Sequence, residues 1–302
     1  MGLNLSGMTT ETRNPRTMQL DQMSPLEIVT VMNEEDARVP LAIAKCLPQI
    51  AQAVTWAAES FEKGGRLFYM GAGTSGRLGV LDAAECPPTF GVPKEMVVGL
   101  IAGGEKAFIE AVEGAEDSRE LAVEDLKAHG LTVDDLVVGI AASGRTPYVL
   151  GGLDYAKSVG CHTAAIACNI GSAIGKAAEL AIEVNCGPEV LTGSTRLKSG
   201  TAQKLILNMI STGSMVRTGK AYQNLMVDVQ QTNEKLHTRA ENIVIDATGV
   251  EREKARAAID AAGGSVKTAI TMLLADCDAQ EAARRLEKAR GHVREAIRLE
   301  VL

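Results

Sequence analysis

The chain has 302 residues, of which 46% are hydrophobic and 23% charged, values typical of a globular protein with one large domain or one domain plus a smaller one. The formal net charge of −7 disfavours a nucleic-acid surface, because phosphate backbones require a positive footprint. No apolar run approaches the roughly 20 residues that cross a bilayer, and no signal-peptide pattern opens the chain. We therefore expect a cytoplasmic protein with neither nucleic-acid nor membrane partners.

The first part of the chain is predicted to form an arm followed by two helices. Residues 1–20 are polar and lack periodicity, which indicates an extended arm, and the opening MGLNLS matches a myristoylation pattern short enough to arise by chance. From residue 24 to residue 63 the pattern is helical, with Ser24 as the cap and a glycine pair as the stop. Pro40 predicts a break between the two helices.

An alternation of short apolar runs and helical stretches then predicts a parallel sheet. The runs lie at residues 66–70, 96–102, 136–142, 162–167 and 180–184. The helical stretches lie after Gly76, at 105–129, after Pro147 and at 172–180. Five buried strands with crossover helices make an α/β fold, a doubly wound five-stranded parallel sheet of the flavodoxin-like type. Ligands in such sheets bind at the carboxyl ends of the strands.

The C-terminal part of the chain is predicted to be helical and to contain a repeat. A long helix is expected at 199–218, and a mixed polar segment follows at 227–247. The pattern Ala262-x-Gly264-x-Val266-Lys267 then recurs as Ala289-x-Gly291-x-Val293-Arg294, each copy typical of two helices around a glycine turn. This composition is similar to the small ubiquitin-associated (UBA) type of module, and we interpret it as a packing appendage or a subunit contact.

The predicted elements divide the chain into three parts. Residues 1–55 form an N-terminal arm and helices, residues 56–225 form the sheet domain, and residues 226–302 form a linker and a small helical domain. The four histidines and six cysteines show no metal-ligand spacing, so neither a metal nor another cofactor is expected.

A glycine-rich loop follows the first predicted strand as Gly71-Ala72-Gly73-Thr74-Ser75-Gly76. Read as GxGxxG, it is a weak signal for a dinucleotide. That reading requires an acidic residue at the end of the second strand, where this chain has none, and Glu105 comes too late. The two hydroxyl groups favour a phosphate held at a helix N-terminus instead.

A second loop of the same kind follows the third predicted strand as Ser143-Gly144-Arg145-Thr146-Pro147. Serine and threonine at such positions commonly do no more than cap a helix, and either loop alone is compatible with that role. Because the two loops follow neighbouring strands of one predicted sheet, together they predict a pocket for a single phosphate group.

These loops resemble those of the sugar isomerase (SIS) domain family, which binds phosphosugars, and the resemblance extends over about residues 56–220. Ser75, Ser143 and Thr146 fall on the family's phosphate-contacting positions. Five longer stretches resemble the N-acetylmuramic acid 6-phosphate etherase family, at residues 10–29, 71–91, 100–117, 141–149 and 187–204. The glucokinase regulatory protein shares some of these motifs but is about twice as long, with two such domains.

The etherase resemblance implies an activity and a set of site residues. The activity is cleavage of the D-lactyl ether of N-acetylmuramic acid 6-phosphate, which gives N-acetylglucosamine 6-phosphate and D-lactate. Glu85 would be the general acid at the lactyl oxygen, and Glu116 its partner at C2. The two loops and the resemblance together predict that Gly73, Thr74, Ser75, Ser143, Gly144, Arg145 and Thr146 bind the substrate. Ser194 and Lys198 are also expected to bind its anionic groups, because they supply a hydroxyl and a cation just before the long predicted helix. The resemblance also implies a homodimer, because sites in this fold family often borrow residues across a dimer contact.

The residues themselves support the two glutamates unequally. Glu85 lies just before Cys86-Pro87-Pro88, where two prolines predict the end of a helix. Glu116 lies in an acidic run, and a solvated helix face is the ordinary explanation of such a run.

The sequence leaves two other classes of function open. A sugar-phosphate isomerase would use the same fold and loops without losing a C3 substituent, and a non-catalytic phosphosugar-binding regulator would not need the acid pair. Fold alone does not decide between them. Release of D-lactate from the muramic sugar phosphate would.

Overall fold

The structure, a computed structural model, describes residues 7–110, 112–229 and 234–299, so the MGLNLS segment lies outside the described residues. The chain forms two compact units. The first contains the residues up to Ala84 together with Glu95–Ser211. The second contains Glu85–Lys94 together with the residues from Thr212 onward.

A five-stranded parallel sheet forms the centre of the first unit, as the sequence predicted. Its strands are β1 (Leu67–Gly71), β2 (Val97–Ile101), β3 (Leu136–Ala141), β4 (His162–Ala167) and β5 (Leu180–Glu183). They are ordered β2-β1-β3-β4-β5, which is the flavodoxin-like order. The order reverses between β1 and β3, so the strands that carry the two predicted loops lie side by side at the switch point.

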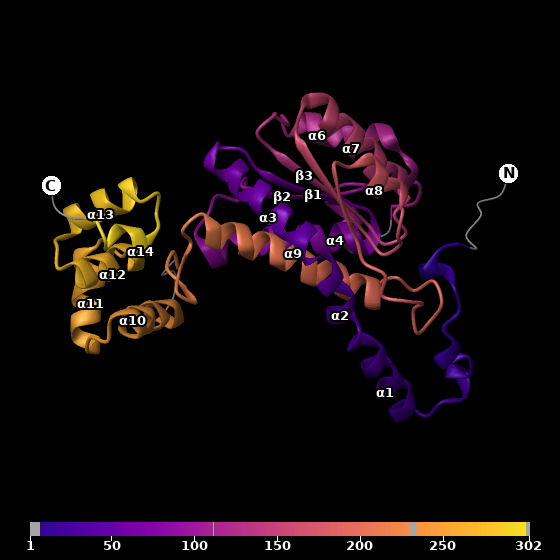
Figure 1. Cartoon of the computed structure of the whole chain (residues 1–302), viewed down its shortest axis with the longest axis horizontal. Coiled ribbons are helices and arrows are strands. Elements are labelled where there is room, and N and C mark those ends of the chain that lie inside the picture. Colours follow the sequence, from indigo (N-terminus) through magenta and orange to yellow (C-terminus); the bar gives the residue numbers. More distant parts are fainter. Residues whose placement is uncertain (1–6, 111, 230–233, 300–302) are drawn as a thin grey trace. The chain divides into compact units, whose positions relative to one another are not determined.

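Helices cover both faces of the sheet, and the alternating side chains of β1 face both layers. Helices α6 (Arg119–Ala128), α7 (Pro147–Val159) and α8 (Ala173–Ala177) lie over one face, where Phe68 and Met70 join the buried cluster around α7 (Figure 1). On the other face lie α3 (Leu47–Glu62), α4 (Gly73–Phe90) and the first part of α9 (Lys198–Arg217). There the Tyr69 hydroxyl donates to the Leu207 carbonyl oxygen at 3.3 Å. Because both faces are covered, every residue of β1 is buried.

The predicted end of a helix just after Glu85 is wrong, because α4 continues through Pro87 and Pro88 to Phe90. A proline lacks the N–H that would bond four residues back, but its fixed φ is compatible with helical geometry. Both prolines lie in the last turn, and the Gly91 N–H closes that turn by donating to the Pro87 carbonyl at 2.9 Å. Near a helix end the two missing bonds therefore do not break the helix.

The helical stretch predicted at 105–129 is also divided in the structure. It consists of α5 (Lys106–Ile109), a 3-10 turn at Ala115–Asp117 and α6. Gly114 has φ +78, which an α-helix does not accommodate. Ser118 then starts α6 by accepting a hydrogen bond from the Leu121 N–H at 3.1 Å. Glu116 therefore lies in a connecting turn and not on a helix face.

The predicted N-terminal helices are present, with one more break than expected. They are α1 (Pro25–Asp36), α2 (Val39–Ile43), a 3-10 turn at Ala44–Cys46 and then α3. Ser24 caps α1 in a reciprocal capping box with Glu27, as its position predicted. The first break falls just before Pro40, and α3 ends before the glycine pair.

The residues before α1 are not the extended arm that their composition predicted. Residues 8–23, here called the N-terminal strap, contain 3-10 turns at Thr9–Glu11, Pro15–Thr17 and Leu20–Gln22. The strap is fastened to the first unit by its polar side chains. Asn14 donates to the Pro188 carbonyl at 3.2 Å, and the Thr17 hydroxyl donates to the Val190 carbonyl at 2.8 Å. The polar side chains of the strap therefore bind it to the first unit.

The second unit is a small helical body with a short hairpin. The hairpin pairs β6 (Ala221–Tyr222) with β7 (Leu225–Met226), and the helices are α10 (Glu234–Thr248), α11 (Arg252–Ala261), α12 (Val266–Ala275), α13 (Ala279–Lys288) and α14 (Val293–Ala296). The predicted repeat is confirmed, since Gly264 and Gly291, both with positive φ, follow α11 and α13. The segment expected to be polar largely forms α10, which buries Ala240, Ile243 and Val244.

Within the described ranges, no helix combines the length and the apolar character that crossing a membrane requires.

Candidate functional site

The first loop (residues 72–76) joins β1 to α4 and becomes the first turn of that helix. The Gly76 N–H donates to the Ala72 carbonyl at 3.2 Å, which is the first bond of the helix. The N–H groups of Gly73, Thr74 and Ser75 therefore precede the helical bonding pattern. Such groups, with the helix dipole behind them, form a natural site for an anion at the carboxyl end of β1.

The second loop (residues 143–146) keeps the shape of a turn before α7 begins. Gly144 has φ +74, and a Cβ there would lie 2.4 Å from the Ser172 Cβ, so only glycine fits. The Ser143 hydroxyl oxygen accepts from the Arg145 N–H at 3.3 Å. The Asn169 side chain, just beyond β4, donates to the Ser143 carbonyl at 3.2 Å. The turn is therefore fixed from both sides.

The N-terminal strap meets the second loop through Asn169. The side chain of Asn169 donates to the Thr10 hydroxyl at 3.0 Å and accepts from the Thr10 N–H at 3.4 Å. Arg145 also reaches the strap, with its guanidinium 3.7 Å from the Met8 sulfur. Thr10 and Asn169 are both buried. A segment far away in sequence thus forms part of the wall around the second loop.

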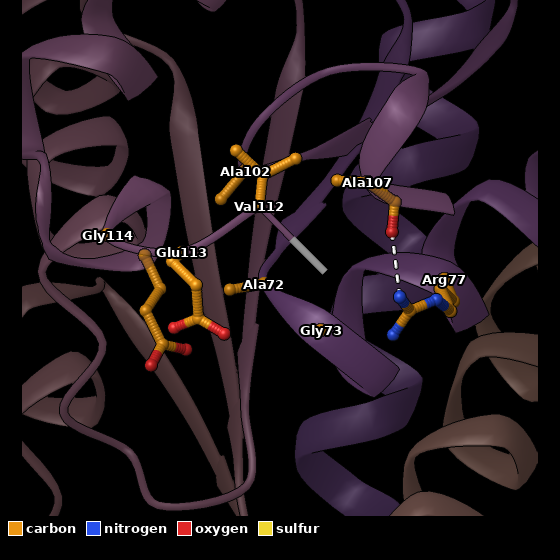
Figure 2. Close-up of a pocket in the computed structure, with 9 residues that line it drawn as sticks. Ala72, Gly73, Arg77, Ala102, Ala107, Val112, Glu113 and Gly114 are labelled. Carbon is orange, nitrogen blue, oxygen red and sulfur yellow. Dashed lines mark hydrogen bonds between the residues drawn. The ribbon is translucent and has the colours of Figure 1, made fainter. Parts of the chain in front are cut away.

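A cavity of about 150 Å³ lies at the carboxyl ends of β1 and β2 (Figure 2). It is lined by Ala72, Gly73, Arg77, Ala102, Ala107, Val112, Glu113, Gly114 and Glu116. Figure 2 shows the Glu113 carboxylate on one side of the cavity and the Arg77 guanidinium on the other. Arg77 donates to the Ala107 and Phe108 carbonyls, each at 2.8 Å, and so fixes α5 against α4. The cavity wall thus contains two carboxylates, and on the opposite side the Arg77 guanidinium fixes α5.

Two of the predicted site residues, Gly73 and Glu116, line this cavity, whereas Thr74, Ser75 and the second loop do not. The structure adds Glu113, which belongs to the acidic run around Glu116 that is typical of a solvated helix face. A signal was present in Gly114, because a glycine directly after Glu113 favours a turn that would separate the acidic residues from a helix.

The structure places Glu85 twelve positions beyond Gly73 on α4, with its side chain exposed. At a rise of about 1.5 Å per residue, the two Cα atoms are about 18 Å apart along the helix axis. Glu85 belongs to the second unit, and Glu116 to the first.

Lys198, predicted to bind substrate, is buried in a polar cluster. Its ammonium group is 2.6 Å from a Glu35 carboxylate oxygen, and the two side chains are 1% and 2% exposed. Arg16 of the strap binds the other oxygen of Glu35 at 2.7 Å. Burial by itself would raise the pKa of Glu35, but hydrogen bonds from Lys198 and Arg16 outweigh it and lower the pKa to about 2. Lys198 is therefore committed to Glu35 in this structure.

The free N–H groups at the start of α9 are likewise bonded to a side chain of the protein. Glu189 is fully buried, and its carboxylate accepts from the N–H groups of Lys198 and Ser199, both at 2.9 Å. A carboxylate at this position satisfies the N–H groups and the dipole that an anionic ligand would otherwise meet. Ser194 lies in the turn before the helix, where its N–H donates to the Leu191 carbonyl at 3.0 Å.

No group of three or more histidine, cysteine, aspartate or glutamate side chains with the arrangement of a metal site occurs in the described part of the chain.

Two family models match the chain, and together they cover most of the first unit. The model of the glucokinase regulatory protein N-terminal SIS domain matches residues 49–157, and the model of the SIS domain matches residues 120–212. Among curated proteins, an N-acetylmuramic acid 6-phosphate etherase of Exiguobacterium sp. is 62% identical over 97% of this chain and 100% of its own length. An enzyme of the same name from Serratia proteamaculans is 61% identical over 98% of this chain and 99% of its own length.

Solved structures share the fold at much lower identity. A phosphosugar isomerase from Bacteroides fragilis, described as putative and involved in capsule formation, has a TM-score of 0.51 and 21% identity, covering 67% of this chain and 95% of that one. A phosphoheptose isomerase from Neisseria gonorrhoeae has a TM-score of 0.50 and 18% identity, covering 63% of this chain and 98% of that one. These structures bear on the fold alone, and it is the doubly wound sheet that they match.

Proposed function

The chain belongs to the N-acetylmuramic acid 6-phosphate etherase family, and from that premise we propose how its residues cleave the D-lactyl ether of N-acetylmuramic acid 6-phosphate. The enzyme is a carbon–oxygen lyase whose products are N-acetylglucosamine 6-phosphate and D-lactate, in the recycling of amino sugars. The observation that carries the proposal is the cavity beside the first loop, with Glu116 in its wall.

The reaction is an elimination followed by an addition. When the sugar ring is open, the C1 aldehyde makes the C2 proton acidic, and a base removes it. An acid then protonates the ether oxygen on C3 and lactate leaves as an alcohol. Water adds to the resulting double bond at C3, and C2 is reprotonated. Each half needs one group that accepts a proton and one that donates a proton, for which two carboxyl groups suffice.

We assign the base at C2 to Glu116 and the acid at the lactyl oxygen to Glu85. Glu116 lies in the wall of the cavity at the carboxyl ends of the strands, the usual ligand position in this fold. The phosphate group is bound by the N–H groups and hydroxyls of the first loop and by the hydroxyls of the second loop. Both glutamates and both loops fall within residues 56–225, the range predicted as the sheet domain, although the structure assigns Glu85 to the second unit.

We further propose that the enzyme acts as a homodimer in which one chain supplies Glu85 to the pocket of the other. Glu85 is exposed and about 18 Å along α4 from Gly73, which is longer than a glutamate side chain spans. The cavity of about 150 Å³ is also smaller than the roughly 300–1,000 Å³ of enclosed small-molecule sites. Helices α1 and α2 leave Leu26 and Leu41 at least 70% exposed, an apolar surface that a second copy would cover.

We place the enzyme in the cytoplasm, because a sugar phosphate carries charge that prevents it from crossing a bilayer unaided.

The mechanism is tested with labelled water and two conservative variants. In deuterated water the C2 position of the product should gain deuterium, and in oxygen-18 water the label should enter the C3 hydroxyl. Glu85→Gln and Glu116→Gln should each lower lactate release by about 10²–10⁴-fold, the usual contribution of general acid–base catalysis. Glu113→Gln, in the same cavity wall, is the matched control and should cost much less. Label appearing in lactate would exclude the mechanism.

The shared site is tested by mixing the two inactive variants. A mixed dimer of Glu85→Gln and Glu116→Gln has one pocket with both native glutamates, so random mixing should restore about a quarter of the wild-type activity. If each pocket used both residues of one chain, mixing would restore nothing, and the shared site would be excluded. A sugar-phosphate isomerase or a non-catalytic regulator, the two alternative functions, would release no D-lactate in any of these assays.

A further inference from the structure

Ser75, a predicted phosphate-binding residue, is hydrogen-bonded to another side chain in this structure. Its hydroxyl donates to the Gln203 side-chain oxygen Oε1 at 3.0 Å. Ser75 is 7% exposed and Gln203 is 1% exposed, so water does not compete for this bond. Gln203 comes from α9, which packs beside the start of α4 on the same face of the sheet (Figure 1).

The other half of the Gln203 amide has no visible function in the fold. Its Nε2 group is buried, and no hydrogen-bond acceptor for it occurs among the described residues. Leaving a buried donor unsatisfied costs more than an average hydrogen bond contributes, so native structures retain few such donors. A leucine of similar size would avoid this cost, and the presence of glutamine calls for a reason other than packing.

The single hydrogen of the Ser75 hydroxyl explains why a glutamine stands at position 203. A serine hydroxyl has one hydrogen, and here that hydrogen is donated to Gln203. A phosphate group presents only acceptor oxygens to it, so the Ser75 hydroxyl cannot donate to phosphate while its hydrogen is donated to Gln203. Ser143 differs, because its hydroxyl oxygen accepts a bond from the Arg145 N–H, which leaves its hydrogen for another acceptor.

We propose that Gln203 is a positioning residue that switches Ser75 from a partner of the protein to a donor for the substrate phosphate. A half-turn of the amide exchanges Oε1 and Nε2, so that Nε2 donates to the Ser75 oxygen and the Ser75 hydrogen turns to a phosphate oxygen. The number of bonds between the two side chains is one before and one after the turn. In both states one amide atom lacks a partner, so the turn loses no hydrogen bond and gains one to a charged group.

This proposal rests on the proposed phosphate site, and its test uses binding, so that it can fail separately from the catalytic assignment. The probe is N-acetylglucosamine 6-phosphate, whose affinity is measured by titration calorimetry on the full-length chain. Burial favours the neutral, donating form of a carboxyl, so the titration is made at a pH high enough to ionise the introduced side chain. Under that condition Gln203→Glu supplies only acceptors, and it should retain the Ser75 hydrogen and weaken binding by about 10–100-fold, the range for one hydrogen bond to a charged group. Gln203→Leu releases Ser75 and should weaken binding by less than tenfold.

Two controls separate this switch from packing and from simple charge repulsion. Lys204→Gln, at the neighbouring exposed position of α9, changes the net charge by the same amount as Gln203→Glu and should leave affinity unchanged. In a Ser75→Ala background, Gln203→Glu should have no further effect on affinity. The melting temperature of Gln203→Leu should stay close to that of the wild type, because the variant removes one unsatisfied buried donor, Nε2, and leaves the Ser75 hydroxyl without its acceptor.

Three results would overturn the switch. Equal losses of affinity in Gln203→Glu and Gln203→Leu would mean that Gln203 contacts the ligand directly. A loss that persists in the Ser75→Ala background would mean charge repulsion. A marked fall in the melting temperature of Gln203→Leu would mean that the amide is a packing element. If the wild type binds the probe but releases no D-lactate from the muramic sugar phosphate, the catalytic proposal fails while the switch is still decided by these measurements.

Discussion

The first and second loops have closely similar sequences and follow neighbouring strands, but the protein anchors them in different ways. The first loop forms the first turn of α4, and the hydrogen bond between Ser75 and Gln203 fixes it to α9. The second loop remains a turn and is held by Asn169, which in turn contacts the N-terminal strap. One loop therefore depends on a helix that packs on the sheet, and the other on a segment from the far end of the sequence.

The difference originates in the glycines. Gly73 has φ +53 in open space and leads directly into helical residues. Gly144 has φ +74 and lies against Ser172, so the chain cannot enter the helix until Pro147. Similar composition thus produces a helix start in one place and a fixed turn in the other, because the surrounding side chains differ.

The largest difference between the two loops is expected when the buried Lys198 is replaced. Lys198→Met leaves the Glu35 carboxylate buried without one of its cations, a change that typically costs about 3–5 kcal/mol. We expect a drop of that size in the free energy of unfolding, and faster hydrogen exchange in the strap and the second loop than in the first loop. Lys204→Met, exposed on the same helix, is the control. Equal loss of protection in both loops would contradict separate anchoring.

A smaller difference in the free energy of unfolding is expected between alanine substitutions at Gly144 and Gly73. Gly144→Ala combines left-handed strain with a contact to Ser172 that is too close, and should cost about 2–4 kcal/mol. Gly73→Ala has the strain without the contact, since nothing lies within 4 Å of the added Cβ, and should cost about 1 kcal/mol. Denaturant unfolding measures both. A first-loop variant as unstable as the second-loop variant would show that the neighbours of Gly144 are not what constrains it.

The most gradual effect is the acid sensitivity of the strap. The pKa of Glu35 is about 2 in the folded chain and near 4.5 otherwise, so its contribution is complete above pH 4.5 and is lost as the pH falls toward 2. The free energy of unfolding should decrease by at most about 1.4 kcal/mol per pH unit in this window on account of this group. Glu35→Gln should remove that part of the slope. An unchanged slope would mean that the carboxylate titrates equally in both states.

The sheet and the two loops could be predicted from the sequence because their signals are local. Each strand is a short apolar run between helical stretches, and the observed strands lie within one residue of those runs. The capping role of Ser24 and the repeat around Gly264 and Gly291 depend on neighbours only a few positions away, and both are confirmed.

The polar interior could not be predicted, because it is built from partners far apart in the chain. Nothing near Lys198 in the sequence indicates that Glu35 will neutralise it, and nothing near Ser75 indicates Gln203. Glu113 is hard to predict for a different reason, because the acidic run around it is typical of one solvated helix although Gly114 interrupts it. The roles of Glu85 and Glu116 rest on family resemblance, and remain a prediction that the variants above will test.

The bond between Glu35 and Lys198 also orders events in time, because it joins residues 163 positions apart. On a ribosome that adds about 5–20 residues per second, roughly 8–30 s separate the synthesis of the two partners. Through that interval the Glu35 carboxylate has no buried cation to meet and stays in water, since an unpaired charge is costly to bury. The strap emerges well before α9 but docks only after it, so the second loop acquires its outer wall only after α9 has begun to form.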